Sequence, residues 1–377
     1  MKHSIVPPYL LAKIAQADEH GMAVAAAAAR RALEGTEPLH EERRLHATEV
    51  QHFSASTPHS KGDPAARPVV HAVPPVVHRT ISDAQGAERL PGRIVRHEGE
   101  SATADVAVTE AYDGLGATFT LFSQVFGRDS IDGRGLPLLA TVHYGRGYDN
   151  AYWDGERMVF GDGDGEVFGR FTSSVSVIGH ELAHGVTQFS SGLAYEGQSG
   201  ALNESFSDVM GVLVEQHQNN QTAAEASWLV GEGLFTPAVQ GKALRSMTAP
   251  GTAYDDDVLG KDPQPADMAH YVKTTDDNGG VHLNSGIPNR AFALTALELG
   301  GFAWQRAGQI WYDTMTAAGA PAGSVAPTLL PAKADFATFA AATVTAATLR
   351  YGAASPEAEA VGAAWVKVGV LKGGSRT

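Results

Sequence analysis

The sequence predicts an α+β fold, with a mixed α/β N-terminal half and an all-helical C-terminal half behind a short helical segment. Two strand-like pieces, 138–144 and 158–160, lie among stretches with the apolar period of a helix. After about 217 the pattern is mostly helical. The helical stretches are 102–127, 172–189, 201–217, 285–300, 302–316 and 334–351. This order of elements is typical of two packed subdomains of different class.

The first fifty residues stand apart from the rest of the chain. Residues 11–34 include an alanine run of high helix propensity, with Gly21 as a weak point, and 41–45 can add a further turn. From about 50 to 80, prolines interleave with small and polar residues, which predicts an exposed linker that is easily cut. We therefore divide the chain into an N-terminal segment, a linker, a mixed subdomain and a helical subdomain, at 1–49, 50–80, 81–205 and 206–377.

Composition excludes several classes of protein. The 377 residues carry a formal net charge of −14, which argues against nucleic acid because phosphate binding requires a basic surface. Without cysteine, disulfides and thiolate metal sites are excluded. No run reaches about 18 apolar residues, and Pro7 and Pro8 interrupt the start before a classical signal peptide can form. We expect a monomer without a membrane partner, either cytoplasmic or secreted by a non-classical route.

The strongest motif is His180-Glu181-Leu182-Ala183-His184. On a helix, residues four apart share a face, so both imidazoles can reach one ion while Glu181 stands beside a bound water. The alternative is a pair of buried, hydrogen-bonded histidines. One class of zinc protease, the metzincins, would carry Gly and His at the positions that here hold Thr187 and Ser190, so that class is excluded.

The next helix offers a third ligand. Glu204 and Asp208 are four apart, and a helical hairpin can bring Glu204 to the ion. Two histidines, a glutamate and a water make an open catalytic zinc site. Asp208 can then accept a hydrogen bond from a ligand imidazole. The alternative for both carboxylates is a solvated helix face.

Two further segments can stabilise an oxyanion. The glycine-rich loop 276–286 carries His282, which Asp277 can orient. Tyr195, just before the helix of Glu204, can donate a second hydrogen bond. Peptide hydrolysis requires such donors because negative charge develops on the carbonyl oxygen.

Together these segments resemble the thermolysin family of zinc endopeptidases, from about Ile81 to the C-terminus. Six segments carry the resemblance in order: 150–153, 161–165, 180–184, 200–208, 244–247 and 278–286. The resemblance implies a zinc-dependent neutral endopeptidase that cleaves peptides or proteins on the amino side of large hydrophobic residues. It also implies a thermolysin-like two-domain metallopeptidase fold, with the His180 helix at the floor of the cleft.

The resemblance assigns roles to individual residues. It implies zinc on His180, His184 and Glu204, supported by Asp208 and Asn203. It implies Glu181 as general base and acid, and an oxyanion site made by Tyr195, His282 and Asp277. The groups that hold the substrate backbone would be Asn150, Ala151 and Arg245. The apolar pocket would be lined by Phe168, Phe171, Val177, Leu234 and Leu244.

Calcium is less expected than zinc. Family members often carry calcium on clustered carboxylates, but the corresponding positions here are Ser176, Ser227, Leu229 and Lys242. Glu215 and Glu232 remain, and two carboxylates seldom make a strong site for an ion that takes about 6–8 oxygen ligands. We therefore do not expect calcium in the usual places.

The N-terminal segment resembles the short propeptide of the protealysin-like subgroup, which has a Pro-Pro-x-Leu element near its start. Here the element is Pro7-Pro8-Tyr9-Leu10, and its prolines predict a stiff, extended backbone. We expect it to lie in or near the cleft, with Tyr9 or Leu10 in apolar subsites. It would act as an inhibitory propeptide in cis until autoprocessing cuts the linker. The alternative is a packed tail without an inhibitory role.

Two other functions stay open on the sequence alone. One is a zinc exopeptidase of the same ligand class, although the chain lacks the Gly-x-Met-Glu-Asn motif of such aminopeptidases. The other is a zinc-stabilised binding protein. Glu181 argues against it, because a structural zinc site does not use an unligated carboxylate beside an open position.

Overall fold

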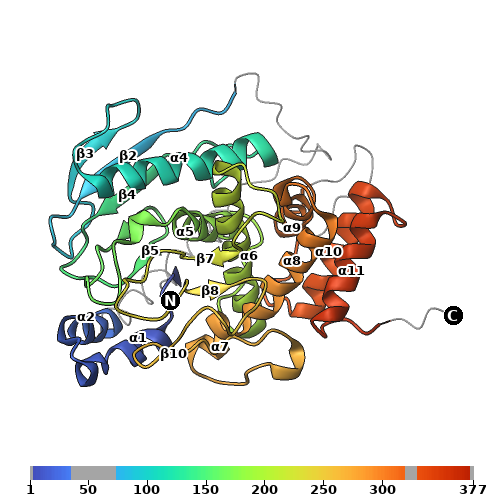
Figure 1. Cartoon of the computed structure of the whole chain (residues 1–377). Helices are drawn as coiled ribbons and strands as arrows, with labels where there is room; N and C mark the ends of the chain where they lie inside the picture. Colours follow the sequence, from blue (N-terminus) through green and yellow to red (C-terminus); the bar gives the residue numbers. More distant parts are fainter. Residues whose placement is uncertain (1–2, 35–73, 319–328, 374–377) are drawn as a thin grey trace.

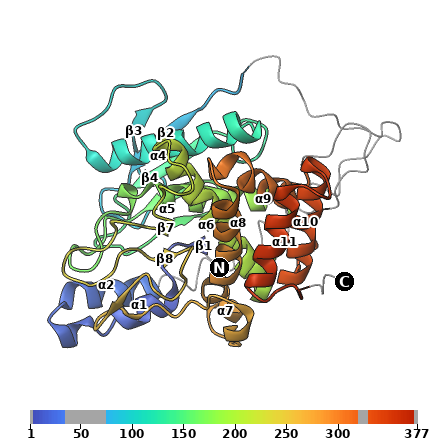
Figure 2. The ribbon, with the colours of Figure 1, turned by 45° about the vertical axis from the view of Figure 1, so that its right-hand side comes forward.

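The computed structural model describes residues 3–34, 74–318 and 329–373 (Figure 1). A mixed sheet with helices makes up the first half, and the second half is mainly helical (Figure 2). The predicted α+β class is confirmed. The turn expected at 41–45 and most of the linker lie outside the described residues.

The N-terminal segment contains a strand and three short helices: β1 (His3–Ser4), α1 (Pro8–Ile14), η1 (Ala17–His20) and α2 (Ala23–Glu34). The expectation of an extended backbone over residues 7–10 is wrong beyond Pro7. Helix α1 begins at Pro8, because the first turn of a helix does not use the N–H that proline lacks. Gly21, with a φ of +82°, ends η1, so the predicted weak point separates two helices.

Six strands form one mixed sheet in the order β1-β5-β6-β4-β2-β3. Strands β2, β4 and β6 are parallel neighbours, whereas β3 and β5 pair antiparallel with β2 and β6. Strand β1 pairs antiparallel with β5, so the N-terminal segment supplies an edge strand of this sheet. The other bounds are β2 (Arg79–Asp83), β3 (Arg93–His97), β4 (Leu138–Val142), β5 (Ala151–Trp153) and β6 (Met158–Phe160).

Helix α4 (Val106–Phe126) packs on β2 and β4. The Asp105 carboxylate caps its start by accepting hydrogen bonds from the N–H groups of Ala107 and Val108. Gly127, in the left-handed region, ends it. These signals place the helix within the range that the sequence predicts.

Helices α5 (Val175–Gln188) and α6 (Gly197–Gln218) pack closely along each other, after the short η2 (Phe171–Ser173). Gly211 makes this approach possible, because a Cβ there would lie 2.3 Å from the carbonyl oxygen of Ser176. The predicted subdomain boundary at 205/206 falls inside α6. Helix α6 therefore contributes residues to both predicted subdomains.

The helical half is built around stacked and edge-on aromatic rings of Phe292, Trp311, Phe339 and Trp365. The sequence analysis did not predict its last helix, α11. The helices are α7 (Asp277–Asn284), α8 (Gly286–Leu299), α9 (Ala307–Thr316), α10 (Phe336–Tyr351), α11 (Pro356–Lys367), η3 (Met268–His270) and η4 (Ala303–Gln305). Two small antiparallel ribbons pair β7 (Leu229–Val230) with β8 (Arg245–Ser246) and β9 (Asp255–Asp256) with β10 (Gly260–Lys261).

Within residues 3–34, 74–318 and 329–373, no helix combines the length and apolar character that crossing a bilayer requires.

Candidate metal centre

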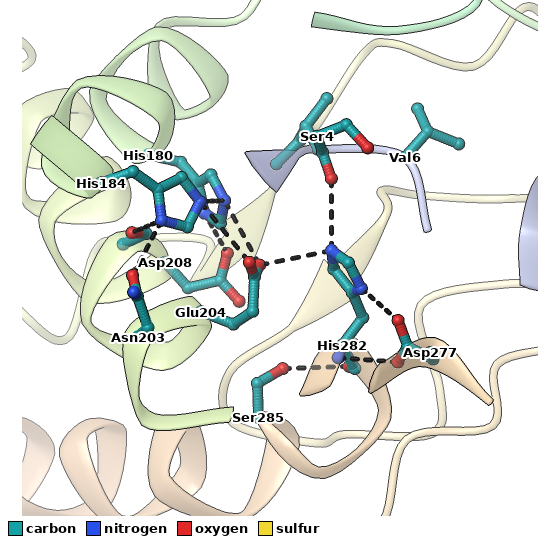
Figure 3. A network of polar contacts seen from close by, with 12 residues as sticks. Ser4, Val6, His180, His184, Asn203, Glu204, Asp208, Asp277, His282 and Ser285 are labelled. Carbon is teal, nitrogen blue, oxygen red and sulfur yellow. Dashed lines mark hydrogen bonds and ion pairs between the residues drawn. The ribbon is translucent and has the colours of Figure 1, made fainter. Parts of the chain in front are cut away.

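The α5–α6 pair brings three potential ligands together in the core of the molecule (Figure 3). The Nε2 atoms of His180 and His184 are 3.1 Å apart, and each is 3.5 Å from a carboxylate oxygen of Glu204. All three side chains are at most 2% exposed. Zinc bonds of about 2.0–2.1 Å in a tetrahedron place ligand atoms about 3.3 Å apart. The three observed separations match that spacing.

The hydrogen bonds behind the two imidazoles fix which nitrogen faces the ion. Nδ1 of His180 lies 2.8 Å from Oδ1 of Asp208, and Nδ1 of His184 lies 2.9 Å from Oδ1 of Asn203. Both partners are acceptors, so each Nδ1 carries the proton and each Nε2 presents a lone pair. Two lone pairs at 3.1 Å repel each other unless a cation lies between them.

Glu204 supplies a second test of the fit. Its Oε2 is buried but has no hydrogen-bond partner among the described residues. A buried carboxylate oxygen without a donor is costly, and a metal ion removes that cost. The donor set of two nitrogens and one carboxylate oxygen is one that zinc accepts, so these residues fit zinc.

Asp208 contacts several side chains behind the ligands. Besides His180, it accepts hydrogen bonds from Nε and Nη2 of Arg245, at 2.9 and 2.8 Å, and from Nδ2 of Asn289 at 2.8 Å. Burial alone would raise the pKa of Asp208, but Arg245 and His180 outweigh it and hold that pKa well below its usual range. The carboxylate therefore stays ionised and keeps His180 in its ligand tautomer.

Glu181, also on α5, is fully buried beside the three ligands. Its Oε2 accepts a hydrogen bond of 2.8 Å from the backbone N–H of Trp153 in β5. This contact fixes the carboxylate between the metal centre and the edge of the sheet. A carboxylate in that position can exchange a proton with a group bound along the edge.

A tyrosine and a histidine face the centre from the opposite side. The Tyr195 hydroxyl donates to Glu204 Oε1 and lies 3.2 Å from Nε2 of His282. Asp277 holds His282, with Oδ1 at 2.5 Å from Nδ1 and Oδ2 accepting from the His282 backbone N–H. Burial disfavours the charged imidazole, but Asp277 and then Glu204 outweigh it and raise the pKa of His282 to about 9.

An unusual backbone makes the Asp277–His282 contact possible. Four successive residues, Asp277 to Gly280, have positive φ, and right-handed helix resumes only afterwards. These residues form a left-handed turn, across which the aspartate reaches a residue five positions later. The glycine-rich loop before a helix, predicted from the sequence, has this turn as its physical basis.

Ser4, Ile5 and Val6 lie across the metal centre. Arg245 Nη1 donates to the carbonyl oxygen of Ile5 at 3.1 Å, and the Ile5 N–H donates to the carbonyl of Ala151 at 3.2 Å. The Asn150 amide makes two bonds to Val6, accepting from its N–H at 3.0 Å and donating to its carbonyl at 3.2 Å. The groups expected to hold a substrate backbone here hold the chain's own N-terminal segment.

The Pro-Pro-Tyr-Leu element lies next to these contacts. Leu10 is buried, and Tyr9 hydrogen-bonds with Tyr254. Burial, reinforced by Tyr254 and Asp262, raises the pKa of Tyr9. The strand that reaches the metal centre is thus the one before the prolines, and the element itself starts helix α1.

The five residues predicted to line an apolar pocket are all buried, at 0–2% exposure, and belong to the same apolar cluster as Ile5. Phe168 and Phe171 pack with ring centroids 5.4 Å apart, and Leu234 and Leu244 lie together against Gly231. The set is Phe168, Phe171, Val177, Leu234 and Leu244.

Two of the residues considered for calcium, Ser176 and Glu215, contact other protein groups. The Ser176 hydroxyl accepts a hydrogen bond from the N–H of Gly231. Burial, opposed by a hydrogen bond from Ser176 and reinforced by Glu232, raises the pKa of Glu215. The prediction on calcium stays a prediction.

Sequence reasoning missed two residues of this centre. Asn289 bonds Asp208, and the Ser207 hydroxyl lies 3.1 Å from Nδ1 of His184. Asn289 has a usable signal, because it shares an otherwise apolar helix face with Phe292 and Ala296. Ser207 has none, since small polar residues are common in helices.

Comparisons with known proteins agree with this geometry. Residues 73–188 match the family model of the thermolysin metallopeptidase catalytic domain, and 191–370 match that of its alpha-helical domain. An extracellular metalloprotease of Pectobacterium carotovorum subsp. carotovorum is 49% identical over 321 residues, which cover 85% of this chain and 86% of that protein. A thermolysin of Alicyclobacillus acidocaldarius is 38% identical over 71% of this chain, which spans 46% of that protein.

A solved structure extends the similarity to the N-terminal segment. The precursor of protealysin, a metalloproteinase from Serratia proteamaculans, superimposes with a TM-score of 0.81 at 48% identity. The match covers 98% of this chain and all of the other. Together with the zinc-type ligand group His180, His184 and Glu204, these similarities confirm the resemblance seen in the sequence. The chain belongs to the thermolysin family of zinc metallopeptidases and is a zinc endopeptidase precursor homologous to that of protealysin.

Proposed function

We propose that this endopeptidase cleaves peptide bonds on the amino side of large hydrophobic residues, and that its N-terminal segment blocks the cleft until the linker is cut. The observation that carries this proposal is the backbone of Ser4–Val6, which hydrogen-bonds with Asn150, Ala151, Arg245 and His282. A substrate backbone would use the same donors and acceptors. The proposal gives each of them a role in binding or chemistry.

Zinc supplies Lewis acidity and makes water a better nucleophile at neutral pH. Glu181 takes up the proton released during the attack and delivers it to the leaving nitrogen. Tyr195 and His282 donate hydrogen bonds to the carbonyl oxygen as negative charge develops there. Asp277 keeps Nδ1 of His282 engaged, so that Nε2 points at the substrate.

Replacement of Glu181 by glutamine tests the chemical part. Glutamine keeps the shape but cannot shuttle a proton, so we expect peptidase activity to fall by about 10²–10⁴-fold with zinc still bound. An internally quenched peptide blocked at both ends gives the activity, and metal analysis gives the zinc content. Glu196→Gln, at an exposed glutamate, is the matched control. Full activity in Glu181→Gln would reject the role.

The same assay tests the specificity. The apolar surroundings of Ile5 favour a large hydrophobic residue after the scissile bond. We expect peptides with leucine or phenylalanine at that position to be cleaved well and those with aspartate poorly. Cleavage that is indifferent to this position would contradict the assignment of the pocket.

The N-terminal segment would inhibit the enzyme by occupying the cleft itself. Ile5 and Val6 are fully buried, so no other peptide can occupy their contacts at the same time. Leu10, Leu11 and Ile14 of α1 are also buried and hold the segment down. The full-length Glu181→Gln protein should therefore remain unprocessed when pure, if the enzyme itself cuts the linker. Efficient maturation of that variant would show that another protease is responsible.

Two relatives are named extracellular, the protease from Pectobacterium and a minor metalloprotease from Serratia marcescens. We therefore propose that this chain also acts outside the cell. Detection of the processed protein in culture medium, with a cytoplasmic marker retained in the cells, would support export.

A further inference from the structure

The N-terminal segment binds with the regular pairing of a β-strand. His3 pairs with Trp153 and Ser4 with Tyr152, antiparallel along the edge of the sheet. Ile5 continues the ladder through its N–H to Ala151. Pairing of this kind fixes the register of the backbone, so each carbonyl from Ser4 to Val6 has a defined direction.

Only the first of these three carbonyls points at the metal centre. The oxygen of Ser4 lies 3.2 Å from Nε2 of His282, which in turn lies 3.6 Å from Glu204 (Figure 3). The oxygens of the next two residues, Ile5 and Val6, are turned away and held by Arg245 and Asn150. The peptide bond that faces the ligand group is therefore the one between Ser4 and Ile5.

The nitrogen of the same bond pairs with the strand that also holds Glu181. The Ile5 N–H pairs with Ala151, and two residues further along β5 the N–H of Trp153 binds the Glu181 carboxylate. Glu181 is therefore anchored on the same strand with which the Ile5 nitrogen pairs, two residues along it. The bond thus has His282 at its carbonyl oxygen, and its nitrogen lies on the strand that holds Glu181.

From this geometry we infer that Ser4–Ile5 is itself a cleavage site of the enzyme, hydrolysed within the same molecule. The inference rests on the proposed catalytic roles. One water is consumed: the C–N bond breaks, a C–O bond forms on the Ser4 carbonyl carbon, and the Ile5 nitrogen gains a proton. The products are the tetrapeptide Met1–Ser4 and a chain that begins at Ile5.

The two products are held very differently. After the cut, the chain from Ile5 onward keeps its bonds to Arg245 and Asn150 and its buried residues in α1. Helix α2 adds a bond of 2.9 Å from the Ala25 N–H to Glu166. Among the described residues of the tetrapeptide, His3 and Ser4 have the short pairing of β1 and the contact of the Ser4 carbonyl with His282. Cleavage therefore releases the tetrapeptide but leaves the cleft blocked, so it does not activate the enzyme.

Mass spectrometry of the purified, zinc-loaded full chain tests the inference. We expect the wild type to lose Met1–Ser4 and to expose Ile5 before any cut in the linker, at a rate independent of protein concentration over a 100-fold range. Glu181→Gln should keep its first four residues. Ile5→Pro, which lacks the N–H that pairs with Ala151, should block the cut, whereas Val24→Ala at an exposed position of α2 should not.

A bond between Ser4 and Ile5 that stays intact in the wild type overturns the inference, provided that the same preparation cleaves the quenched peptide after its linker is cut. If that peptide also remains intact, the proposed catalytic roles fail with it. A cut whose rate rises with protein concentration overturns the intramolecular part.

A stability measurement tests, without any catalysis, whether residues 1–4 are held less firmly than the chain from Ile5 onward. In the zinc-loaded Glu181→Gln protein, deletion of residues 1–4 should leave the melting temperature within about 1 °C. Deletion of residues 1–6 removes the contacts to Arg245 and Asn150 and should lower it by several degrees. An equal loss in both deletions would show that the tetrapeptide is an anchor, which contradicts the inference.

Discussion

The contacts that organise the zinc ligands on α5 and α6 run between side chains, whereas the contacts of Ser4–Val6 with the cleft use the strand's backbone. His180 and His184 bond Asp208 and Asn203, each through a specific atom. The strand offers only N–H and C=O groups to its partners. Side-chain recognition ties the metal centre to one sequence. Backbone hydrogen bonds do not depend on the side chains of the bound peptide, so the N-terminal segment and a substrate can share one set of groups.

The largest expected effect comes from removing a side-chain contact behind the zinc ligands. Asp208→Ala leaves the buried guanidinium of Arg245 without its partner, and we expect about 3–5 kcal/mol of lost stability. Urea unfolding of the zinc-loaded protein measures it. Asp18→Ala is the contrast, because its pair with Arg30 is about half exposed and should contribute far less to stability. Equal losses would mean that the buried network is not a stabilising hub.

Asn150→Ala instead removes contacts with the backbone of Ser4–Val6. Two hydrogen bonds to the strand are lost, which corresponds to about 1–3 kcal/mol of binding. We expect the KM of the mature enzyme for peptides to rise about tenfold with a smaller change in kcat, and the precursor to activate faster. Steady-state kinetics and a time course of processing measure these, with Asn219→Ala at an exposed site as control. A fall in kcat alone would place Asn150 in the chemistry.

Glu166→Ala tests a contact of the N-terminal segment that lies further from the metal centre. Glu166 caps the first turn of α2 through the Ala25 N–H, and loss of a cap costs about 1 kcal/mol. Melting of the Glu181→Gln precursor should show a small decrease that is absent once the N-terminal segment has been removed. Glu156→Ala, at a mostly exposed glutamate, should have no effect. A decrease that persists in the mature form would assign Glu166 to the catalytic domain alone.

The smallest effect concerns His143, outside both regions. Burial disfavours its charge, but Asp162 and Asp105 outweigh burial and raise its pKa above 6.5. A raised folded-state pKa gives stability that is complete below the unfolded value and is lost as pH rises through the folded value. We expect a loss below about 1 kcal/mol from pH 6.5 upward, since the groups are partly exposed. Melting curves of His143→Gln should lack this component.

The metal centre could be predicted from the sequence because it depends on local periodicity. His180, His184, Glu204 and Asp208 follow the four-residue repeat of a helix, which needs no knowledge of the remaining fold. Only their meeting across two helices is tertiary. The contact of Asp208 with Asn289, which lies 81 residues later, has no such local signal.

The strand β1 could not be predicted in the same way. It has two residues and pairs with an edge that forms only when β5 and β6 are in place, so no period marks it. The start of helix α1 differs from the expectation because proline, which fits an extended backbone, also suits the first turn of a helix. Helix α11 does carry a start signal in the sequence, a serine cap followed by Pro356 and acidic residues.

Gly211 has a consequence for the metal itself. The distance between the axes of α5 and α6 is set where its missing side chain lets the carbonyl of Ser176 approach. A single added methyl group would wedge the two helices apart and stretch the gap that His180 and Glu204 span together. The width of this helix pair, and not the donor atoms alone, thus determines whether the ligands can meet at one ion.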